Sequence, residues 1–123
     1  MTTKDIANKL VELCKQGKNE EAVNTLFAAD AISVEASAPP GGSAESKGIA
    51  AIKAKGEWWM NNHEIHSASI RGPWPHDDRF VVGYTYDVTN KPSGKRMTLD
   101  EVGLYTVTNG KIVKAEFFYD MGG

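Results

Sequence analysis

The pattern of hydrophobic and polar positions changes from helical to strand-like near the middle of the chain. In the first half, apolar side chains recur every three or four residues, which is the spacing of one face of a helix. We expect a first helix that Thr2 and Asp5 cap and that ends near Gly17, and a second that begins near Asn19. Ser46 is placed to cap a third helix.

The second half favours strands, because β-branched and aromatic side chains alternate there with polar ones. Together with a short strand between the second and third helices, the expected strands cover about 30–35, 64–71, 79–89, 97–108 and 111–120. The segment 37–46 is rich in proline and glycine and is expected to be a loop. Helix formers followed by strand formers indicate an α+β domain.

The Asn109-Gly110 dipeptide predicts a two-residue turn, and this turn sets the register of the last hairpin. With Thr108 opposite Lys111, successive side chains alternate between the two faces of the sheet. The face expected to look at the helices carries Val102, Leu104, Thr106, Val113, Ala115, Phe117 and Tyr119. In the preceding strand, the positions expected on that same inner face are Phe80, Val82, Tyr84, Tyr86 and Val88.

The opposite face of the hairpin is expected to be the outer one, and it is also rich in apolar side chains. These are Tyr105, Val107, Ile112 and Phe118. Because large exposed apolar patches mark interfaces, we expect a homodimer through the outer face of the sheet. Glu101 and Glu116 would lie there too, at the dimer interface or in solvent, unless a one-residue bulge reverses the faces of Glu101, Glu116 and Asp120.

Composition and charge narrow the class of protein. The 123 residues and 13.4 kDa fit a single domain. The net charge is −2 and no basic stripe is visible, which argues against a nucleic-acid partner. The single cysteine, Cys14, rules out an intrachain disulfide and a cysteine-based zinc site. No apolar run suits a membrane helix or a signal peptide, so we expect a cytoplasmic protein without membrane association.

Several segments together resemble the nuclear transport factor 2 superfamily. They are Leu26-Phe27-Ala28-Ala29-Asp30-Ala31-Ile32, Lys47-Gly48-Ile49-Ala50-Ala51-Ile52, and the stretches 100–107, 109–113 and 116–120 of the closing hairpin. Within the superfamily the chain is most similar to SnoaL-like proteins, a group named for a polyketide cyclase and related in fold to ketosteroid isomerase. The resemblance implies one SnoaL-like domain over 1–123. Its fold would be a cone-shaped roll, with three N-terminal helices packed on a curved, mostly antiparallel sheet.

The resemblance also suggests where chemistry would take place. In an alignment on Leu26-Phe27 and Asp30, Glu35 falls where ketosteroid isomerase has its general-base aspartate. The two oxyanion donors of that enzyme correspond to Leu10 and Val102, so both are apolar here. SnoaL-type cyclases use an acidic residue in an apolar pocket and no cofactor, which implies the same for this chain.

The candidate catalytic residues are Glu35, Asp100 and His66. Glu35 ends the first strand, where a carboxyl group in apolar surroundings suits proton abstraction beside a carbonyl; a solvated strand-end carboxylate is the alternative. Asp100 is the one acid on the expected inner face, and a charge that reaches water is its alternative. His66 could shuttle a proton inside the cavity, although a structural histidine would leave the same pattern.

The cavity wall is expected to be aromatic and aliphatic, with plain core packing as the alternative. Its candidate substrate-binding residues are Tyr84, Tyr86, Tyr119, Trp59, Phe117, Val102 and Leu10. We therefore expect an isomerase- or cyclase-type enzyme that needs neither cofactor nor metal and acts by carboxylate acid–base chemistry on a small hydrophobic carbonyl compound. The alternative is a non-catalytic domain that binds a hydrophobic ligand or dimerises.

Overall fold

The computed structural model describes residues 1–38 and 41–119, and it contains the three expected helices. These are α1 (Thr3–Lys15), α2 (Asn19–Leu26) and α3 (Ile49–Asn62). The predicted capping box is confirmed, because the Thr2 and Asp5 side chains each accept from the other residue's backbone amide. Within the described residues, none of the helices has the length and hydropathy that crossing a membrane requires.

The third helix begins two residues later than the cap at Ser46 predicted, because its N-cap is Gly48. Residues Glu45–Lys47 form a short strand, β2, that pairs with β1 (Phe27–Val34). Pairing holds the backbone of Ser46 in an extended conformation, so the turn into α3 falls on Gly48, whose φ of 87° favours glycine. Part of the expected loop 37–46 is therefore a strand at the edge of the sheet.

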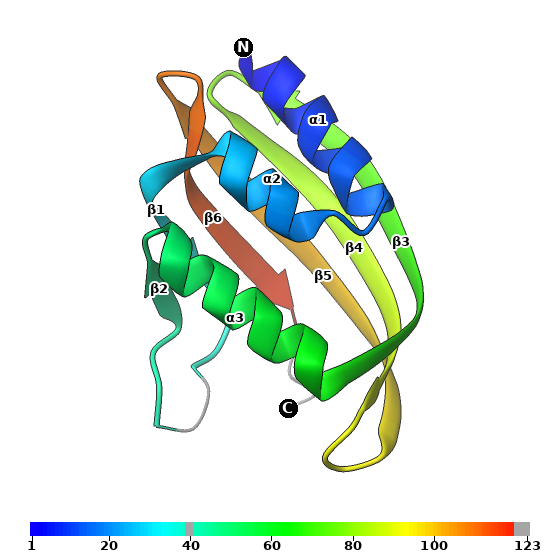
Figure 1. Cartoon of the computed structure of the whole chain (residues 1–123). Coiled ribbons are helices and arrows are strands. Elements are labelled where there is room, and N and C mark those ends of the chain that lie inside the picture. The colour runs from blue at the N-terminus through cyan, green and yellow to red at the C-terminus, as the bar shows by residue number, and fades with distance from the viewer. Residues whose placement is uncertain (39–40, 120–123) are drawn as a thin grey trace.

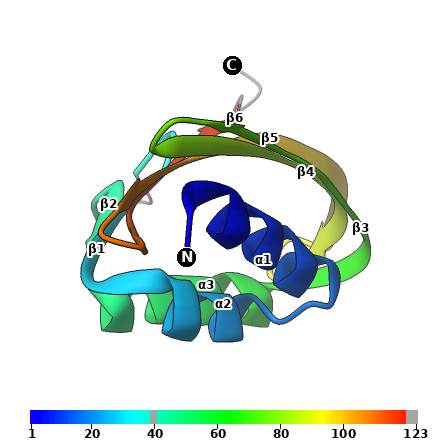
Figure 2. The same ribbon diagram turned by 90° about the horizontal axis from the view of Figure 1, so that it is seen from above.

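Six strands form one sheet, in the order β2-β1-β6-β5-β4-β3 (Figure 1). The long strands are β3 (His63–His76), β4 (Arg79–Asn90), β5 (Lys95–Thr108) and β6 (Lys111–Tyr119). All neighbouring pairs are antiparallel except β1 and β6, which are parallel. Seen from above, the sheet arches over the helices, with α1 inside the arch (Figure 2). The expected α+β roll with a curved, mostly antiparallel sheet is confirmed.

The core lies between the concave face of the sheet and the helices. Ile6 and Leu10 of α1 and Leu26 of α2 are buried against Phe80 and Val82 of β4. The even positions of β4 face inward, as the alternation predicted. Burial of these apolar side chains is the main term that holds the helices on the sheet.

A β-bulge near the last turn reverses one of the predicted faces. Asn109 and Gly110 form the expected turn, and Thr108 pairs with Lys111. Beyond Val107 and Ile112 the register shifts by one residue, so that Thr106 pairs with Lys114. Along β6, this bulge allows Ile112 and Ala115 to be buried on the same side of the sheet.

The face predicted for β5 is therefore wrong. Tyr105 and Val107 lie inside the arch, in register with the inward positions of β4, whereas Val102 and Leu104 face outward. The prediction for β6 beyond the bulge is right, since Ala115 is buried and Phe117 packs against the core. One extra residue in β6, at the bulge, therefore reverses the faces that we predicted for the side chains of β5.

Candidate functional site

A large open cavity of about 1670 Å³ lies between the inner face of the sheet and the helices. Most of its wall is apolar or aromatic. This part of the wall includes Leu10, Val23, Phe27, Ile52, Trp59, Tyr84, Tyr86 and Phe117. Charged groups meet on the side where β1, β5, β6 and α3 come together. A cavity of this kind, with a few convergent polar groups, is the usual form of a small-molecule site.

A carboxylate–ammonium pair forms the first part of this charged side. Glu35, directly after β1, places Oε1 3.5 Å from Nζ of Lys55, which reaches in from α3. The same ammonium donates a hydrogen bond to the buried Ser33 hydroxyl and lies 5.3 Å from the centre of the Phe117 ring. Groups from β1, from the residue directly after it and from β6 thus fix the position of Lys55, and Lys55 in turn fixes one oxygen of Glu35.

The second oxygen of Glu35 has a different environment. Oε2 is buried and accepts no hydrogen bond from any group in residues 1–38 and 41–119. A buried acceptor without a donor costs free energy, so such an atom commonly has a functional reason. Because Lys55 holds Oε1, Oε2 is the atom of this carboxyl group that is left to receive a proton.

Glu101 supplies a second carboxyl group to the same side of the cavity. The bulge turns it inward, opposite Tyr84 on β4 and Tyr119 on β6. Its pKa is raised from 4.5 to about 7, mainly because burial disfavours the charge, and further because Glu35 is negative; Lys55 opposes this rise. Near neutral pH, Glu101 therefore carries a proton much of the time and can donate a hydrogen bond.

Tyr119 completes the charged side of the cavity. Burial raises the pKa of its hydroxyl, and the charges of Glu35 and Glu101 raise it further, while the backbone amides of Ala36 and Ser37 act in the opposite direction. Tyr119 is thus a neutral phenol close to both carboxyl groups. Two carboxyl groups, one of them protonated much of the time near neutral pH, and one phenol therefore meet on this side of the cavity.

A model of the SnoaL-like domain family matches residues 1–119. The chain belongs to the SnoaL-like family. Among solved structures, it is similar to a candidate SnoaL-like polyketide cyclase from Mesorhizobium loti, with 45% identity and a TM-score of 0.91 over 97% of this chain and all of that one. A comparison with curated proteins found no match.

More distant structures share the fold. A candidate isomerase from Bacillus subtilis is 15% identical, with a TM-score of 0.77 over 98% of this chain and 90% of that one. A nuclear transport factor 2-like protein from Burkholderia thailandensis is 16% identical, with a TM-score of 0.83 over 98% and 92% of the two chains. Similarities at this level of identity establish the fold and carry no catalytic assignment.

Two of the three predicted catalytic residues of this SnoaL-like protein have their side chains on the outer face of the sheet, although Asp100 also borders the cavity. Asp100 is 78% exposed on the outer face, where it accepts a hydrogen bond from Thr85 and pairs with Arg71. His66 also lies on the outer face, with Nε2 2.7 Å from the Thr89 hydroxyl. The bulge places Asp100 outward, and a shift of register beside His66 does the same for the histidine.

The predicted wall residues are at the cavity with one exception. Leu10, Trp59, Tyr84, Tyr86, Phe117 and Tyr119 all line it. Val102 does not, because the register of β5 turns it to the outer face, where it is 38% exposed. It is thus not the inner-face counterpart of an oxyanion donor.

Sequence reasoning did not select three residues that the structure brings to the site. Lys55 lies three residues after Ile52 and four before Trp59, which places it on the apolar face of α3. This spacing could have indicated that its side chain reaches the cavity. His63, rather than His66, reaches the cavity, where it stacks on Trp59 at 4.5 Å. Glu101 was assigned to the wrong face, and Asp120 lies outside the described residues. No cluster of three metal-ligating side chains occurs in 1–38 and 41–119.

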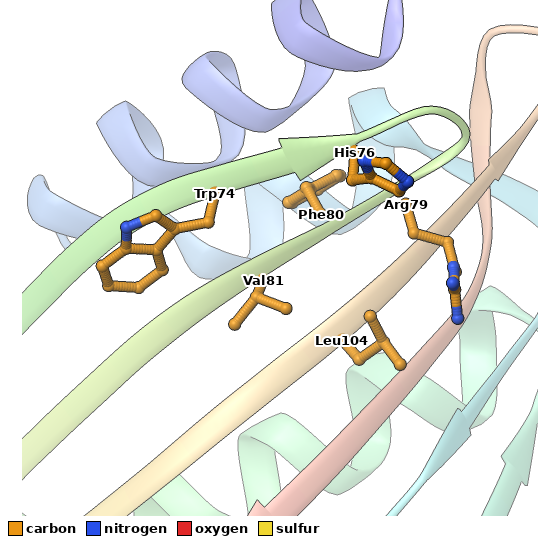
Figure 3. A pocket seen from close by; sticks show the side chains of 6 residues that line it. All are labelled: Trp74, His76, Arg79, Phe80, Val81 and Leu104. Atoms are coloured by element: carbon orange, nitrogen blue, oxygen red, sulfur yellow. The ribbon is translucent and has the colours of Figure 1, made fainter.

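The outer face of the sheet is less apolar than predicted. Tyr105, Val107 and Ile112 are buried inside, and of the expected residues only Phe118 faces outward, 53% exposed. Other apolar side chains take their place, because Trp74, Val81 and Leu104 lie in register across β3, β4 and β5. They border a small depression of about 180 Å³ near the β3–β4 turn (Figure 3).

Proposed function

We propose that this SnoaL-like protein is an isomerase- or cyclase-type enzyme that acts by carboxylate acid–base chemistry on a small hydrophobic carbonyl compound. The observation that carries the proposal is the pair of unlike carboxyl groups in an apolar cavity. Glu35 has a buried, unpartnered oxygen beside an ammonium, and Glu101 holds a proton near neutral pH. Environments that separate two neighbouring acids in this way assign one to the base and the other to the acid.

The reaction begins with a ligand whose carbonyl oxygen faces Glu101. Oε2 of Glu35 removes a proton from the carbon next to the carbonyl, and the electron pair of that C–H bond moves into the carbonyl to give an enolate. Protonated Glu101 donates a hydrogen bond to the enolate oxygen, where negative charge develops. Glu35 then returns the proton to another carbon in an isomerisation. In a cyclisation, the enolate carbon attacks a second carbonyl instead, and the alkoxide that forms there takes the proton back from Glu35.

The test uses 1-tetralone, a bicyclic ketone with exchangeable hydrogens at C2, next to the carbonyl. In D2O the protein is expected to accelerate deuterium exchange at C2, measured by NMR against the rate in buffer alone. Binding of 1-tetralone without accelerated exchange would instead favour the alternative, a domain that binds a hydrophobic ligand without converting it.

Lys55→Met is expected to move the pH dependence of this exchange. Lys55 lowers the pKa of Glu101, so without the ammonium Glu101 keeps its proton to higher pH. The limb of the rate profile that falls at alkaline pH should shift upward by roughly one pH unit, and Lys55→Arg should restore it. Lys53→Met is the matched control, because that lysine pairs with Glu20 at 3.4 Å. An unchanged profile in Lys55→Met would contradict this role.

We also propose that two copies of the chain associate through the outer face of the sheet. Trp74 and Phe118, both more than half exposed, lie there with Val81, Val102 and Leu104. Phe118→Lys is expected to shift the protein from dimer to monomer in size-exclusion chromatography with light scattering, because a buried unpaired charge is costly. Met60→Lys, on an exposed position of α3, should leave the dimer intact. A monomeric wild-type protein would rule the interface out.

A further inference from the structure

A chain of three hydrogen-bonding side chains lines the cavity apart from the carboxyl groups. The hydroxyls of Tyr84 on β4 and Tyr105 on β5 hydrogen-bond to each other, and the Tyr84 hydroxyl also contacts the Cys14 thiol of α1. The two tyrosines are almost fully buried, and all three residues contribute to the cavity wall. The proposed proton transfer uses none of them.

These three side chains have one more donor hydrogen than they need for the hydrogen bonds among themselves. Each of the three groups carries one hydrogen, and the two links within the chain use two of them. The side chains of Cys14, Tyr84 and Tyr105 make no hydrogen bond with any other residue in 1–38 and 41–119. When Tyr105 donates to Tyr84 and Tyr84 to Cys14, the spare hydrogen is that of the thiol, a weak donor that is cheap to leave unpaired. Reversing the chain moves the spare hydrogen to Tyr105, a strong donor.

Gly103 determines where the Tyr105 hydroxyl lies. A Cβ atom on Gly103 would be 2.8 Å from Cε2 and 3.0 Å from the hydroxyl oxygen of Tyr105, so the ring covers the glycine. The side chain therefore runs back along β5 toward Glu101, which precedes Gly103 by two residues on the same face. Two residues of a strand span roughly 6.7 Å, which sets the approximate separation of the tyrosine hydroxyl and the Glu101 position.

The three groups are neutral at physiological pH. Burial raises the pKa of the Cys14 thiol to about 11 and that of both tyrosines well above their usual range. The site can therefore reverse the direction of its hydrogen bonds without gaining or losing charge. A neutral donor in apolar surroundings suits a neutral acceptor, such as a ketone, ester or ether oxygen, better than an anion.

We propose that the Cys14–Tyr84–Tyr105 chain is a second ligand-binding subsite, which donates one hydrogen bond to an acceptor oxygen about 7 Å from the oxygen that Glu101 contacts. The inference rests on the proposed function for the placement of the ligand carbonyl at Glu101. It narrows the substrate class to carbonyl compounds that carry a second, neutral oxygen across an apolar ring or chain.

Two probes of nearly equal size test this subsite. 6-Methoxy-1-tetralone carries an ether oxygen opposite the carbonyl, and 6-ethyl-1-tetralone replaces that oxygen by a methylene group. Wild-type protein is expected to bind the methoxy compound about three- to ten-fold more tightly, in line with one net hydrogen bond. Dissociation constants from isothermal titration calorimetry give the ratio without reference to turnover.

The decisive variant is Tyr84→Phe/Tyr105→Phe. Tyr105→Phe leaves the Cys14–Tyr84 pair with one spare hydrogen, and Tyr84→Phe breaks both links and leaves a spare hydrogen on Tyr105 and on Cys14. Only the double variant removes both strong donors and leaves no orphaned hydroxyl. The affinity ratio should fall to about one, while Thr89→Val, which removes a hydroxyl from the outer face of the sheet, should keep it. Gly103→Ala offers a second route, because its Cβ would displace the Tyr105 hydroxyl.

The possible outcomes separate this inference from the proposed function. Equal affinity of wild type for the two probes, or an unchanged ratio in a folded double variant, overturns the subsite whether or not 1-tetralone exchanges deuterium. A ratio that depends on the two tyrosines supports the subsite, even if exchange is not accelerated and the protein only binds its ligand.

Discussion

Glu35→Gln is expected to slow deuterium exchange at C2 of 1-tetralone by about 10²–10⁴-fold, the usual contribution of a general base. Glutamine preserves the shape of the side chain but cannot accept a proton at this pH. The oxygen of its amide can still contact Lys55, which holds Oε1 of the carboxylate in the wild-type protein. The loss should therefore appear in the exchange rate, with the affinity for 1-tetralone changed only slightly.

The matched control is Glu45→Gln. Glu45 lies in the edge strand β2, where it pairs with Val34, the residue that precedes Glu35. The side chain of Glu45 is exposed. The same chemical change at this position should leave exchange at the wild-type rate. Full exchange activity in Glu35→Gln, with thermal stability equal to that of Glu45→Gln, would remove Glu35 from the mechanism.

Glu101→Gln is expected to abolish the alkaline fall in the exchange rate. In the wild-type protein, Glu101 loses its proton around pH 7 and can no longer donate a hydrogen bond to the enolate, so the rate should drop as pH rises beyond that value. A glutamine amide donates at every pH, more weakly. Its profile should be lower at pH 6 and flat above pH 7.

The same substitution should change how stability depends on pH. Because the pKa of Glu101 is about 7 when folded and 4.5 otherwise, the folded protein binds this proton more tightly. Its contribution is fully present below about pH 4.5 and is lost as pH rises to 7. Relative to Glu101→Gln, the wild-type free energy of unfolding should fall across this window by on the order of 1–3 kcal/mol. Urea unfolding at pH 5 and pH 8 measures the difference.

Asp100→Asn tests whether this effect belongs to the inner face. Asp100 precedes Glu101 and lies on the outer face, where Thr85 and Arg71 contact it. Its replacement should leave both the alkaline limb and the stability difference unchanged. If the wild-type limb persisted in Glu101→Gln and disappeared in Asp100→Asn, the assignment of the two acids would be reversed.

The wrong faces predicted for Asp100 and Glu101 show that an error of one residue in register affects every side chain of a strand. Asn109-Gly110 correctly predicted the turn, because its two residues adopt the left-handed conformations that a tight hairpin needs. The register beyond the turn depends on the bulge at Val113, between the paired residues Ile112 and Lys114. Nothing in the residues next to the turn distinguishes a bulge from regular pairing. Both faces of β5 carried apolar residues, so hydrophobic alternation could not decide between Glu101 and Asp100.

The helices and β4 were predictable because each depends on short-range patterns. The Thr2–Asp5 capping box and the inward positions of β4 follow from neighbours a few residues apart. Glu35 also reached the cavity as predicted, since it follows directly after a strand whose end the loop composition indicated. Lys55 was not selected, because its partners Ser33 and Glu35 lie about twenty residues away in sequence.

The sequence by itself determined the α+β order, the start of the first helix at its capping box, the closing turn and the family of this protein, because local backbone preferences and alternation depend on neighbouring residues. Only the tertiary structure decided which acid shares the cavity with Glu35, which ammonium holds it, and which hydroxyls form the second polar chain. Those choices depend on the register between strands and on long-range packing, and one inserted residue is enough to exchange the two faces of a strand.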